Sequence, residues 1–319
     1  MNKVIVTGGA GFIGSHVVER LIEAGCFVTI IDNFKTGQES NVARFKPGSF
    51  SLIRDSVLSI GRHASRVADH RAIFHLAAEV GNINSIEHPA TDAETNVLGT
   101  ITVCEFARQA GMKVIYSSSS AIYGETMVLP VTEEHPTAPL SPYGLSKLTG
   151  ELYVQIYGRL YGLKYACLRY FNVFGEGQLF NPYSNVIPIF VQRLLNGEDL
   201  TVFGDGAQTR DFVHVKDVAE ANYLAFRSEA PAGSYNVGTG VRSSLLDLLN
   251  VLRELHGPFN PRFEASRAGE VRDSVADIQV IVKNLGFRPT FNLEEGVSAY
   301  YRWRSSQKDS AGGSSRDLL

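Results

Sequence analysis

The chain reads VIVTGGAGFIG at residues 4–14, and this stretch decides the fold. A short apolar run suited to a buried strand leads into glycines spaced GxxGxxG, at Gly8, Gly11 and Gly14, and then into an amphipathic segment. In dinucleotide-binding folds the first glycine permits a tight turn, the second lets the backbone approach a pyrophosphate, and the third lets helix and strand pack closely. The N-terminus of the helix then faces the phosphate charge. This context favours a dinucleotide site over a purely structural glycine turn.

Short apolar runs alternate with helical patterns in the first half of the chain. The alternation predicts a parallel sheet covered by helices on both faces. Right-handed crossovers make it a doubly wound α/β fold of the Rossmann type. The predicted strands cover residues 4–7, 27–31, 51–53, 73–76, 114–117 and 165–169, and the clearest helical patterns cover residues 12–24, 91–110 and 143–160.

The rhythm of the sequence changes after Gly175, where glycine, proline and asparagine become frequent and the strand–helix repeat is lost. We therefore expect a cofactor-binding domain over residues 1–175 and a smaller C-terminal α/β lobe, which binds the substrate, over residues 176–304. Part of segment 213–240 is expected to return to the first domain. Residues 305–319 are rich in serine and poor in apolar side chains, so we expect a disordered tail.

The composition excludes several classes of protein. The 319 residues carry 30 basic and 33 acidic side chains, a net charge of −3, and the sequence has no Lys/Arg cluster, which argues against a nucleic-acid partner. Cys26, Cys104 and Cys167 have no CxxC or Cys/His spacing, so we expect no metal site and a reducing compartment. No apolar stretch approaches the ~20 residues that span a bilayer. We expect a cytoplasmic protein without a membrane partner.

Asp32 ends the second predicted strand, close to the ~20-residue offset from the glycine turn at which an acidic side chain binds the adenosine ribose hydroxyls. Its charge would repel a 2′-phosphate, so the sequence predicts NAD in preference to NADP. Lys35 is the nearby residue that argues for NADP. Asp55, after the third strand, is a candidate to lie near the adenine; by itself it would be interpreted as a solvated loop acid.

Tyr143 and Lys147 lie four residues apart at the start of a predicted helix, and therefore on one face of it. A phenol with a pKa near 10 is a weak base at neutral pH. A nearby ammonium and a cationic nicotinamide favour the phenolate and lower that pKa. The pair can then exchange a proton with a sugar hydroxyl while a hydride moves to or from the cofactor. Four serines, residues 117–120, end the fifth strand, at the edge where open α/β sheets bind ligands.

Together these motifs resemble those of the extended short-chain dehydrogenase/reductase family, in particular its nucleotide-sugar epimerases and dehydratases. The resemblance covers about residues 2–303 and is greatest to the UDP-glucose 4-epimerase branch. It rests on TGGAGFIGSH (7–16), DN (32–33), HLAA (75–78), NVLGT (96–100), SSSSAIYG (117–124), SPYGLSK (141–147), RYFNVFG (169–175), FGDGAQTRDFVHV (203–215), YNVGTG (235–240) and RAGEVRDSVAD (267–277).

The resemblance implies roles for individual residues. Tyr143 would be the base and acid, Lys147 would position Tyr143 and the nicotinamide ribose, and Ser119 would bond the sugar 4-hydroxyl. The implied cofactor contacts are Gly8, Gly11, Phe12, Ile13, Gly14, Asp32, Asn33, Asp55, Ser56, Leu76, Ala77, Ala78, Asn96, Tyr143, Lys147 and Phe171. The implied substrate contacts are Ser119, Asn172, Asn185, Val186, Val202, Phe203, Arg210, Arg267, Glu270 and Ser274.

Two of these implied contacts have a direct physical reason and one departs from the family. The guanidinium groups of Arg210 and Arg267 suit a diphosphate because each can form two parallel hydrogen bonds with it. Glu270 stands where the family usually has aspartate, which puts its ribose contact in question.

The implied activity is NAD-dependent UDP-hexose 4-epimerisation, in which transient oxidation at sugar C4 gives a 4-keto intermediate. UDP-glucose and UDP-galactose are the implied substrates, and the small Ser274 leaves room for their N-acetyl forms. The alternatives are another nucleotide-sugar enzyme of the family (a dehydratase, decarboxylase, uronate epimerase or 4-keto reductase) and a non-catalytic NAD-sensing protein. Ser120 and Ala121 replace the Asp-Glu pair usual in dehydratases, and loop 79–85 lacks the cation often found in uronate epimerases.

A homodimer is also implied by the resemblance, through a four-helix contact to which each subunit contributes segments 91–110 and 143–160. The second segment carries Leu148, Leu152, Ile156 and Leu160 at helical spacing. The same residues are also consistent with packing against the core of their own chain.

Overall fold

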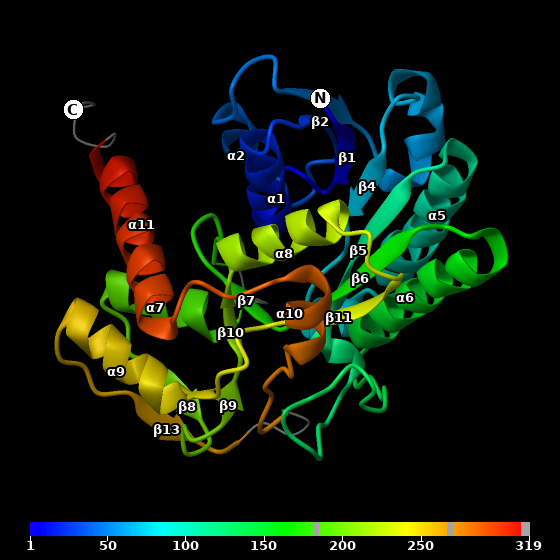
Figure 1. The fold of residues 1–319 in the computed structure, drawn as a ribbon. Helices are drawn as coiled ribbons and strands as arrows, with labels where there is room; N and C mark the ends of the chain where they lie inside the picture. Colours follow the sequence, from blue (N-terminus) through cyan, green and yellow to red (C-terminus); the bar gives the residue numbers. More distant parts are fainter. Residues whose placement is uncertain (181–184, 267–270, 314–319) are drawn as a thin grey trace.

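The computed structural model describes residues 1–180, 185–266 and 271–313. Its centre is a seven-stranded parallel sheet in the order β11-β6-β5-β4-β1-β2-β3 (Figure 1). The strands are β1 (Lys3–Thr7), β2 (Phe27–Asp32), β3 (Phe50–Arg54), β4 (Ala72–His75), β5 (Lys113–Ser119), β6 (Tyr165–Tyr170) and β11 (Gly233–Val237). The doubly wound α/β fold and its first six strands, predicted from the sequence, are confirmed.

The strand order reverses at β1: the chain first runs outward through β2 and β3 and then, from β4, builds the other side. β1 pairs with β2 from Lys3↔Phe27 to Thr7↔Ile31, and on its other edge it pairs with β4. Its last four residues are buried because helices cover both faces of the sheet, which explains the continuous apolar run. Such a reversal opens a crevice at the carboxyl ends of the strands.

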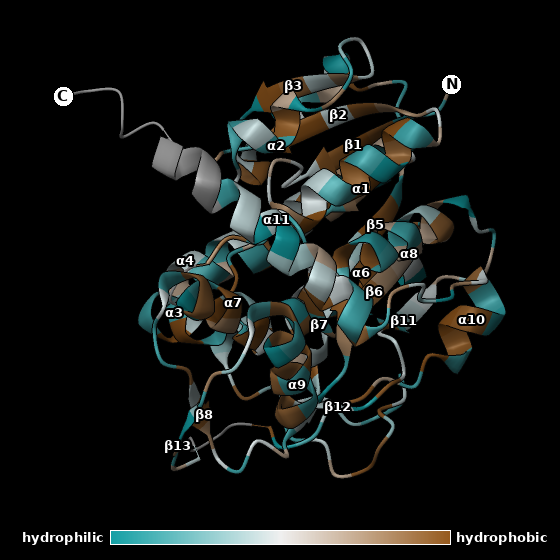
Figure 2. Ribbon diagram, turned by 90° about the vertical axis from the view of Figure 1, so that its left-hand side faces the viewer, coloured by the Kyte–Doolittle hydropathy of each residue, from teal (hydrophilic) through white to brown (hydrophobic). Residues whose placement is uncertain are grey.

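Helices cover the two faces of the sheet separately. α1 (Phe12–Glu23) and α8 (Val215–Arg227) cover one face, and η1 (Val57–Arg66), α5 (Gly99–Ala110) and α6 (Pro142–Tyr161) cover the other. Figure 2 shows the strands mainly in brown and the helices carrying teal residues. The six strands from β1 to β6 supply apolar side chains to both cores, and β11 supplies them to the core on the α1 face.

The helix expected over residues 91–110 is continuous but irregular. It begins as α4 (Pro89–Ala93), widens into a π-helical segment, η2 (Glu94–Leu98), and continues as α5. Such segments interrupt the regular helical register and often occur at functional sites. Here the segment contains Asn96, which is only 2% exposed. Four short helices complete the description of the sheet domain and its connections: α2 (Glu39–Ala43), α3 (Asn82–Glu87), η3 (Ser120–Ile122) and α10 (Gln279–Leu285).

A smaller lobe holds the remaining elements. Its strands pair two by two: β7 (Asn172–Phe174) with β10 (Phe212–His214), β8 (Thr201–Phe203) with β13 (Arg262–Glu264), and β9 (Thr209–Arg210) with β12 (Ser243–Ser244). α7 (Val186–Asn196), α9 (Leu245–His256) and α11 (Leu293–Gly313) enclose a separate apolar core between them. The core includes Phe190, Leu249 and Tyr300.

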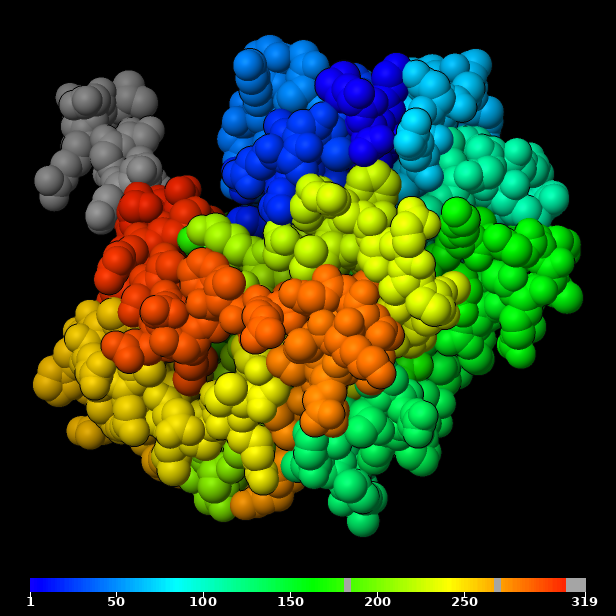
Figure 3. All heavy atoms as spheres, in the orientation of Figure 1, coloured from blue at the N-terminus to red at the C-terminus, as the bar shows by residue number. Residues whose placement is uncertain are grey.

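The chain passes between the lobes more than once, and its first return lies within segment 213–240, where a return was expected. α8 and β11 belong to the sheet domain, where β11 pairs with β6. A second return lies beyond the segment that the sequence pointed to: Ile281, Leu285 and Phe287, in and after α10, join the core on the α1 face. In Figure 3 this orange part of the chain lies at the centre of the face, between the C-terminal helix and the sheet domain. Residues 176–304 therefore do not form one continuous lobe.

The structure also differs from the predicted tail at its beginning. α11 runs to Gly313, so the helix extends into the segment that was expected to be disordered from residue 305. The start of that segment is anchored locally. Arg304 donates to Gln192 on α7, and Ser305 and Ser306 donate to carbonyl oxygens one helical turn earlier. Residues 314–319 lie outside the described residues.

Three further observations concern the cysteines, membrane-spanning helices and metal-binding groups. Cys26, Cys104 and Cys167 are all buried as free thiols. Within the described ranges, no helix is both long and apolar enough to cross a membrane. In the same part of the chain, no group of three or more His, Cys, Asp or Glu side chains could hold a metal ion.

Candidate functional site

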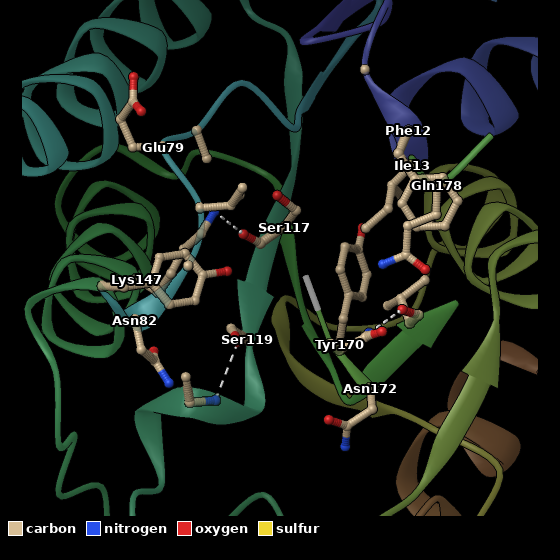
Figure 4. A pocket seen from close by; sticks show the side chains of 18 of the residues that line it. Phe12, Ile13, Glu79, Asn82, Ser117, Ser119, Lys147, Tyr170, Asn172 and Gln178 are labelled. Atoms are coloured by element: carbon tan, nitrogen blue, oxygen red, sulfur yellow. Dashed lines mark hydrogen bonds between the residues drawn. The ribbon is translucent and has the colours of Figure 1, made fainter. Parts of the chain in front are cut away.

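A cavity of about 1310 Å³ lies between the two lobes, at the carboxyl ends of the central strands. Figure 4 shows Lys147, Asn82 and Ser119 on one side of it, Phe12, Ile13 and Gln178 on the other, and Asn172 below. All the predicted site residues that the structure describes line this cavity, with the exception of Asn96. Residues that are far apart in the sequence are therefore brought to one site.

The glycine turn forms one wall of the cavity, and close backbone contacts require its glycines. Gly8 adopts a positive φ of 71°, and a Cβ there would lie 2.7 Å from Ala77 N. A Cβ on Gly14 would lie 2.0 Å from Gly8 O, so any side chain would force the turn apart. Gly11 is the N-cap of α1 and has no capping side chain, which leaves the first amides of the helix directed at the cavity.

Asp32 lies at the end of β2, beside this turn. Its carboxylate accepts hydrogen bonds from Ala10 N at 2.9 Å and Phe34 N at 2.8 Å, which fixes its orientation. Asp55, after β3, accepts from Ser56 N and lies 2.8 Å from His63 Nε2. These hydrogen bonds lower the pKa of Asp55, with His63 the larger cause. Two fixed carboxylates therefore lie at the β2–β3 end of the cavity.

Ser119, Tyr143 and Lys147 lie at the other end, beyond β5. Ser119 is the last residue of β5, and its hydroxyl accepts from Ala121 N at 3.2 Å, which caps η3. Ser141 caps α6, and Tyr143 and Lys147 follow on one face of that helix. Lys147 Nζ donates to Ser117 O at 3.0 Å and lies 5.9 Å from the centre of the Tyr143 ring. The helix cap and the strand end thus place the three side chains together.

The electrostatics of this trio differ from the expectation that Lys147 lowers the pKa of Tyr143. Burial raises the pKa of Tyr143 to about 12, a shift that the hydrogen bond with Ser119 opposes. Burial also lowers the pKa of Lys147 to about 8, with the Asp92 carboxylate acting in the opposite direction. The polypeptide alone therefore favours the neutral phenol. A phenolate would need a further positive charge in the cavity.

Asn96 is the predicted cofactor contact that the structure does not place in the cavity wall. Its side-chain oxygen accepts from Glu79 N at 2.9 Å, and its amide nitrogen donates to Glu79 O, Asp92 and Ser146. The π-helical segment turns this side chain inward, under the loop that follows β4. Asn96 therefore holds two neighbouring elements, the loop at Glu79 and the helix that carries Lys147, instead of lining the cavity itself.

The second lobe contributes the opposite wall. Asn185 is the N-cap residue of α7, but its side chain makes no hydrogen bond to the helix. Its Nδ2 donates to Val173 O at 2.9 Å, and its Oδ1 is buried without a partner among the described residues. Arg210 Nη1 donates to the carbonyl oxygens of Thr209 and Arg272. Both residues line the cavity, as do Val186, Val202, Phe203 and Ser274. Arg267 and Glu270 lie outside the described residues.

Several lining residues were missed by the sequence interpretation. Asn82, Gln178, Arg193 and Gln208 contribute polar groups to the cavity wall. Gln178 Oε1 and Gln208 Oε1 are buried and lack hydrogen-bond partners in the described part of the chain. Gln178 follows the glycines of the turn at residues 175–177, and that polar position beside a glycine turn is the signal that could have identified it.

The donor groups of the cavity suit a dinucleotide and a second phosphorylated ligand. The glycine turn gives close backbone approach at the N-terminus of α1, and Asp32 presents a carboxylate for ribose hydroxyls. The N-terminus of α7 and the guanidinium of Arg210 suit a second anionic group. A phenol, a serine hydroxyl and an ammonium lie together at the end of β5. The arrangement fits redox chemistry at an alcohol carbon, with a proton exchanged at Tyr143.

Comparison with known proteins identifies a family and similar enzymes. The model of the NAD dependent epimerase/dehydratase family matches residues 4–238. A UDP-glucose 4-epimerase of Mycolicibacterium smegmatis is 35% identical over 305 residues, covering 93% of this chain and 96% of that protein.

Two solved structures of 4-epimerases are also similar to this chain. The UDP-N-acetylglucosamine 4-epimerase of Methanobrevibacter ruminantium, in complex with UDP-N-acetylmuramic acid, is 35% identical with a TM-score of 0.91, covering 96% of this chain and 99% of its own. The UDP-glucose 4-epimerase of Thermus thermophilus, in complex with NAD, is 36% identical with a TM-score of 0.84, covering 95% and 99%.

Proposed function

This chain belongs to the NAD-dependent epimerase/dehydratase family, and on that premise we propose that it is an NAD-dependent UDP-hexose 4-epimerase. The observation that carries the proposal is the presence of Ser119, Tyr143 and Lys147 in the same cavity as the glycine turn and Arg210. A binding protein without activity has no need to keep all three reactive side chains, so the intact set argues against an NAD-sensing protein.

Bound NAD would supply hydride transfer to and from sugar C4. The chain's own residues supply binding, orientation and proton transfer. Gly8, Gly11 and Gly14 admit the pyrophosphate to the N-terminus of α1, and Asp32 receives the adenosine ribose hydroxyls. These residues fit the cofactor, because a Cβ at Gly8 or Gly14 would clash with the backbone, so that only glycine leaves the turn in this shape.

The positive charge of bound NAD would favour the phenolate of Tyr143, which then takes the proton of the sugar 4-hydroxyl and gives it back. Ser119, which lines the same cavity as Tyr143, orients that hydroxyl toward the phenol. Lys147 adds a positive charge below the ring, and its fixed bond to Ser117 O keeps the ammonium in place. The 4-keto sugar must then turn over before it is reduced on its other face.

In this proposal the second lobe binds the UDP group. The N-terminus of α7, beginning at Val186, and the guanidinium of Arg210 receive the diphosphate, and Val202 and Phe203 lie against the base. Asn172, Asn185, Arg267 and Glu270 complete the proposed contacts. A UDP group held in this way leaves the hexose free to rotate, which epimerisation requires.

The choice of sugar is argued from two features of the site. Ser274 lines the cavity and is small, which leaves room for a 2-N-acetyl group beside the glucose and galactose forms. Ser120 and Ala121 carry no carboxyl group, so the site lacks the acid and base needed to eliminate the C6 hydroxyl. UDP-glucose, UDP-galactose and their N-acetyl forms are therefore the substrates of this proposal.

A homodimer is part of the proposal. α6 leaves Leu152, Ile156 and Leu160 exposed at 47%, 38% and 65%, and Leu98 beside them is 54% exposed. Leu148 differs from the expectation, because it packs against a core cluster of its own chain. η2, which contains Leu98, contacts α6, so these exposed apolar residues lie on neighbouring elements. A contiguous apolar face of this kind marks an interaction surface.

The deciding experiment is incubation of the purified protein with UDP-glucose, UDP-galactose, UDP-GlcNAc and UDP-GalNAc, each followed by proton NMR of the anomeric signals. We expect interconversion at C4 within at least one pair, without net consumption of NAD. No interconversion of any of the four would contradict the proposal. A stable keto product, loss of a carboxyl carbon from a uronate, or consumption of NADH would select another enzyme of the family.

A further inference from the structure

An ion pair joins the two loops on either side of the glycine turn. Lys35 Nζ lies 2.5 Å from Glu79 Oε1, and both residues line the cavity. Lys35 follows β2 and Glu79 follows β4. In the sheet these strands are the two neighbours of β1, so the pair spans the carboxyl end of β1, where the glycine turn begins.

The glutamate end of this ion pair is held rigidly. Glu79 is fixed through its backbone, which exchanges two hydrogen bonds with the buried Asn96 side chain at 2.9 and 3.0 Å. Its side chain is only 11% exposed. Burial of this kind reduces screening by solvent, which otherwise makes surface ion pairs weak.

The lysine end is much more exposed than the glutamate end. The Lys35 side chain is 53% exposed, and its backbone N donates to Asn33 Oδ1 at 3.0 Å. A lysine has four rotatable side-chain bonds, and it can leave the pair without disturbing the sheet. The pair is thus built from one fixed and one movable partner.

We propose that the Lys35–Glu79 pair is a strap that closes over bound NAD and slows its release. The inference rests on NAD binding along the glycine turn, and not on which sugar is epimerised. An enzyme that returns its hydride in every cycle gains from keeping the same cofactor molecule bound, so a slow release suits the proposed reaction.

The strap also gives a role to Lys35. Lys35 argued for NADP because a cation near the adenosine ribose can pair with a 2′-phosphate. With its ammonium engaged by Glu79, Lys35 is drawn across the turn instead, and Asp32 is left as the charge beside the ribose.

The test is the rate at which bound NAD leaves the purified protein in the absence of sugar. The protein is loaded with NAD and freed of excess by gel filtration, and released NAD is then measured over time after dilution. We expect Glu79→Gln and Lys35→Met each to release NAD roughly two to five times faster than the unchanged protein, the range expected for breaking one partly exposed pair. The double variant should release it no faster than either single variant.

Two controls keep the proposal falsifiable. Lys3 and Asp69 form an ion pair of the same length between exposed side chains, and neither lines the cavity, so Asp69→Asn should leave the release rate unchanged. Added NaCl should speed release from the unchanged protein more than from Glu79→Gln, because the exposed Lys35 end leaves the intact pair open to partial screening, an effect that the variant lacks.

Other outcomes overturn the strap. An unchanged rate in Glu79→Gln, additive effects in the double variant, or an equal effect of Asp69→Asn would each do so. Because no sugar is present, these outcomes are independent of whether the protein proves to be a 4-epimerase.

Discussion

At the scale of single residues, Tyr143 has the most direct part in the proposed reaction. Tyr143→Phe removes the group placed to exchange the proton of the sugar 4-hydroxyl, and we expect turnover to fall by roughly 10²–10⁴-fold with NAD still bound. Ser119→Ala should cost less, because it removes an orienting group and leaves the phenol. The measurement is initial-rate epimerisation by NMR, with bound NAD quantified after denaturation. Tyr153→Phe, on an exposed part of the same helix, is the matched control; full activity in Tyr143→Phe would remove the residue from its role.

Lys147 gives a prediction about stability and pH. Its pKa is lowered to about 8 in the fold, against about 10.4 in an unfolded chain. The unfolded state therefore binds the proton more tightly, and the charged lysine destabilises the fold below pH 8 by roughly 3 kcal/mol. That cost disappears as the pH rises from 8 towards 10.5.

We therefore expect Lys147→Met to be more stable than the unchanged protein at pH 7, by roughly 2 kcal/mol once the lost hydrogen bond to Ser117 is allowed for. The difference should shrink steadily between pH 8 and 10. Urea unfolding of both proteins at matched pH values measures it. A difference that does not change with pH would show that burial of the charge is not its origin.

The reactive residues could be predicted from the sequence because each one stands at a position that local rules define. Asp32 ends a strand, Ser119 ends another, and Tyr143 and Lys147 sit just inside a capped helix. Asn96 points away from the cavity because its direction depends on a π-helical segment, which no local pattern indicates. Asn82, the first residue of α3, and Gln208, in a loop, were missed because a single polar side chain gives the same sequence signal whether it faces a cavity or the solvent.

At the scale of elements, the glycine turn is the feature that tolerates substitution least. In Gly14→Ala the new methyl group would lie 2.0 Å from Gly8 O, so the turn must open. We expect a loss of roughly 1–3 kcal/mol in unfolding free energy and loss of copurifying NAD. Thermal unfolding and the NAD content of the purified protein check both. Gly61→Ala, where a Cβ meets nothing within 4 Å, should change neither; NAD retained at full occupancy in Gly14→Ala would refute the reason given.

The strands of the sheet were predictable because helices bury both of their faces, which makes each one a short uninterrupted apolar run. The short strands of the second lobe were not. β9 and β12 contain two residues each, too few to show any periodicity. They form because Asp211, buried next to β9, accepts hydrogen bonds from Thr239 N, Gly240 N and Ala276 N, which lie far along the chain.

At the scale of the whole molecule, the exposed face of α6 predicts association. Leu152→Glu combined with Ile156→Glu places two charges on the proposed contact, and we expect the dimer to become a monomer. Light scattering at micromolar concentration measures the mass, and circular dichroism checks that the fold is kept. Val128→Glu, at another exposed apolar position (66%), should leave the dimer intact. A monomeric unchanged protein would contradict the dimer itself.

The division of the chain into two lobes could be predicted from the sequence only in part. The predicted boundary at residue 175 marks where the regular strand–helix repeat of the sequence is lost. The return through β11 lies within segment 213–240, where a return was expected. The return through α10 could not be predicted from the sequence, because α10 reaches the first core by packing against α8 and β11, and residues far apart in the chain then share that core. Ile281, for example, shares its core cluster with Val4.

This repeated passage between the lobes has a consequence for how the molecule comes apart. Neither lobe can lose its core while the other stays whole, since Tyr235 and Phe287 serve the first core and Leu249 and Tyr300, interleaved with them in the chain, serve the second. Melting should therefore be cooperative, and calorimetry should record a single heat-absorption peak; two separated peaks would contradict this. It follows that no single cut in the chain would give two fragments that each fold alone. The two walls of the cavity can therefore form only from one intact chain.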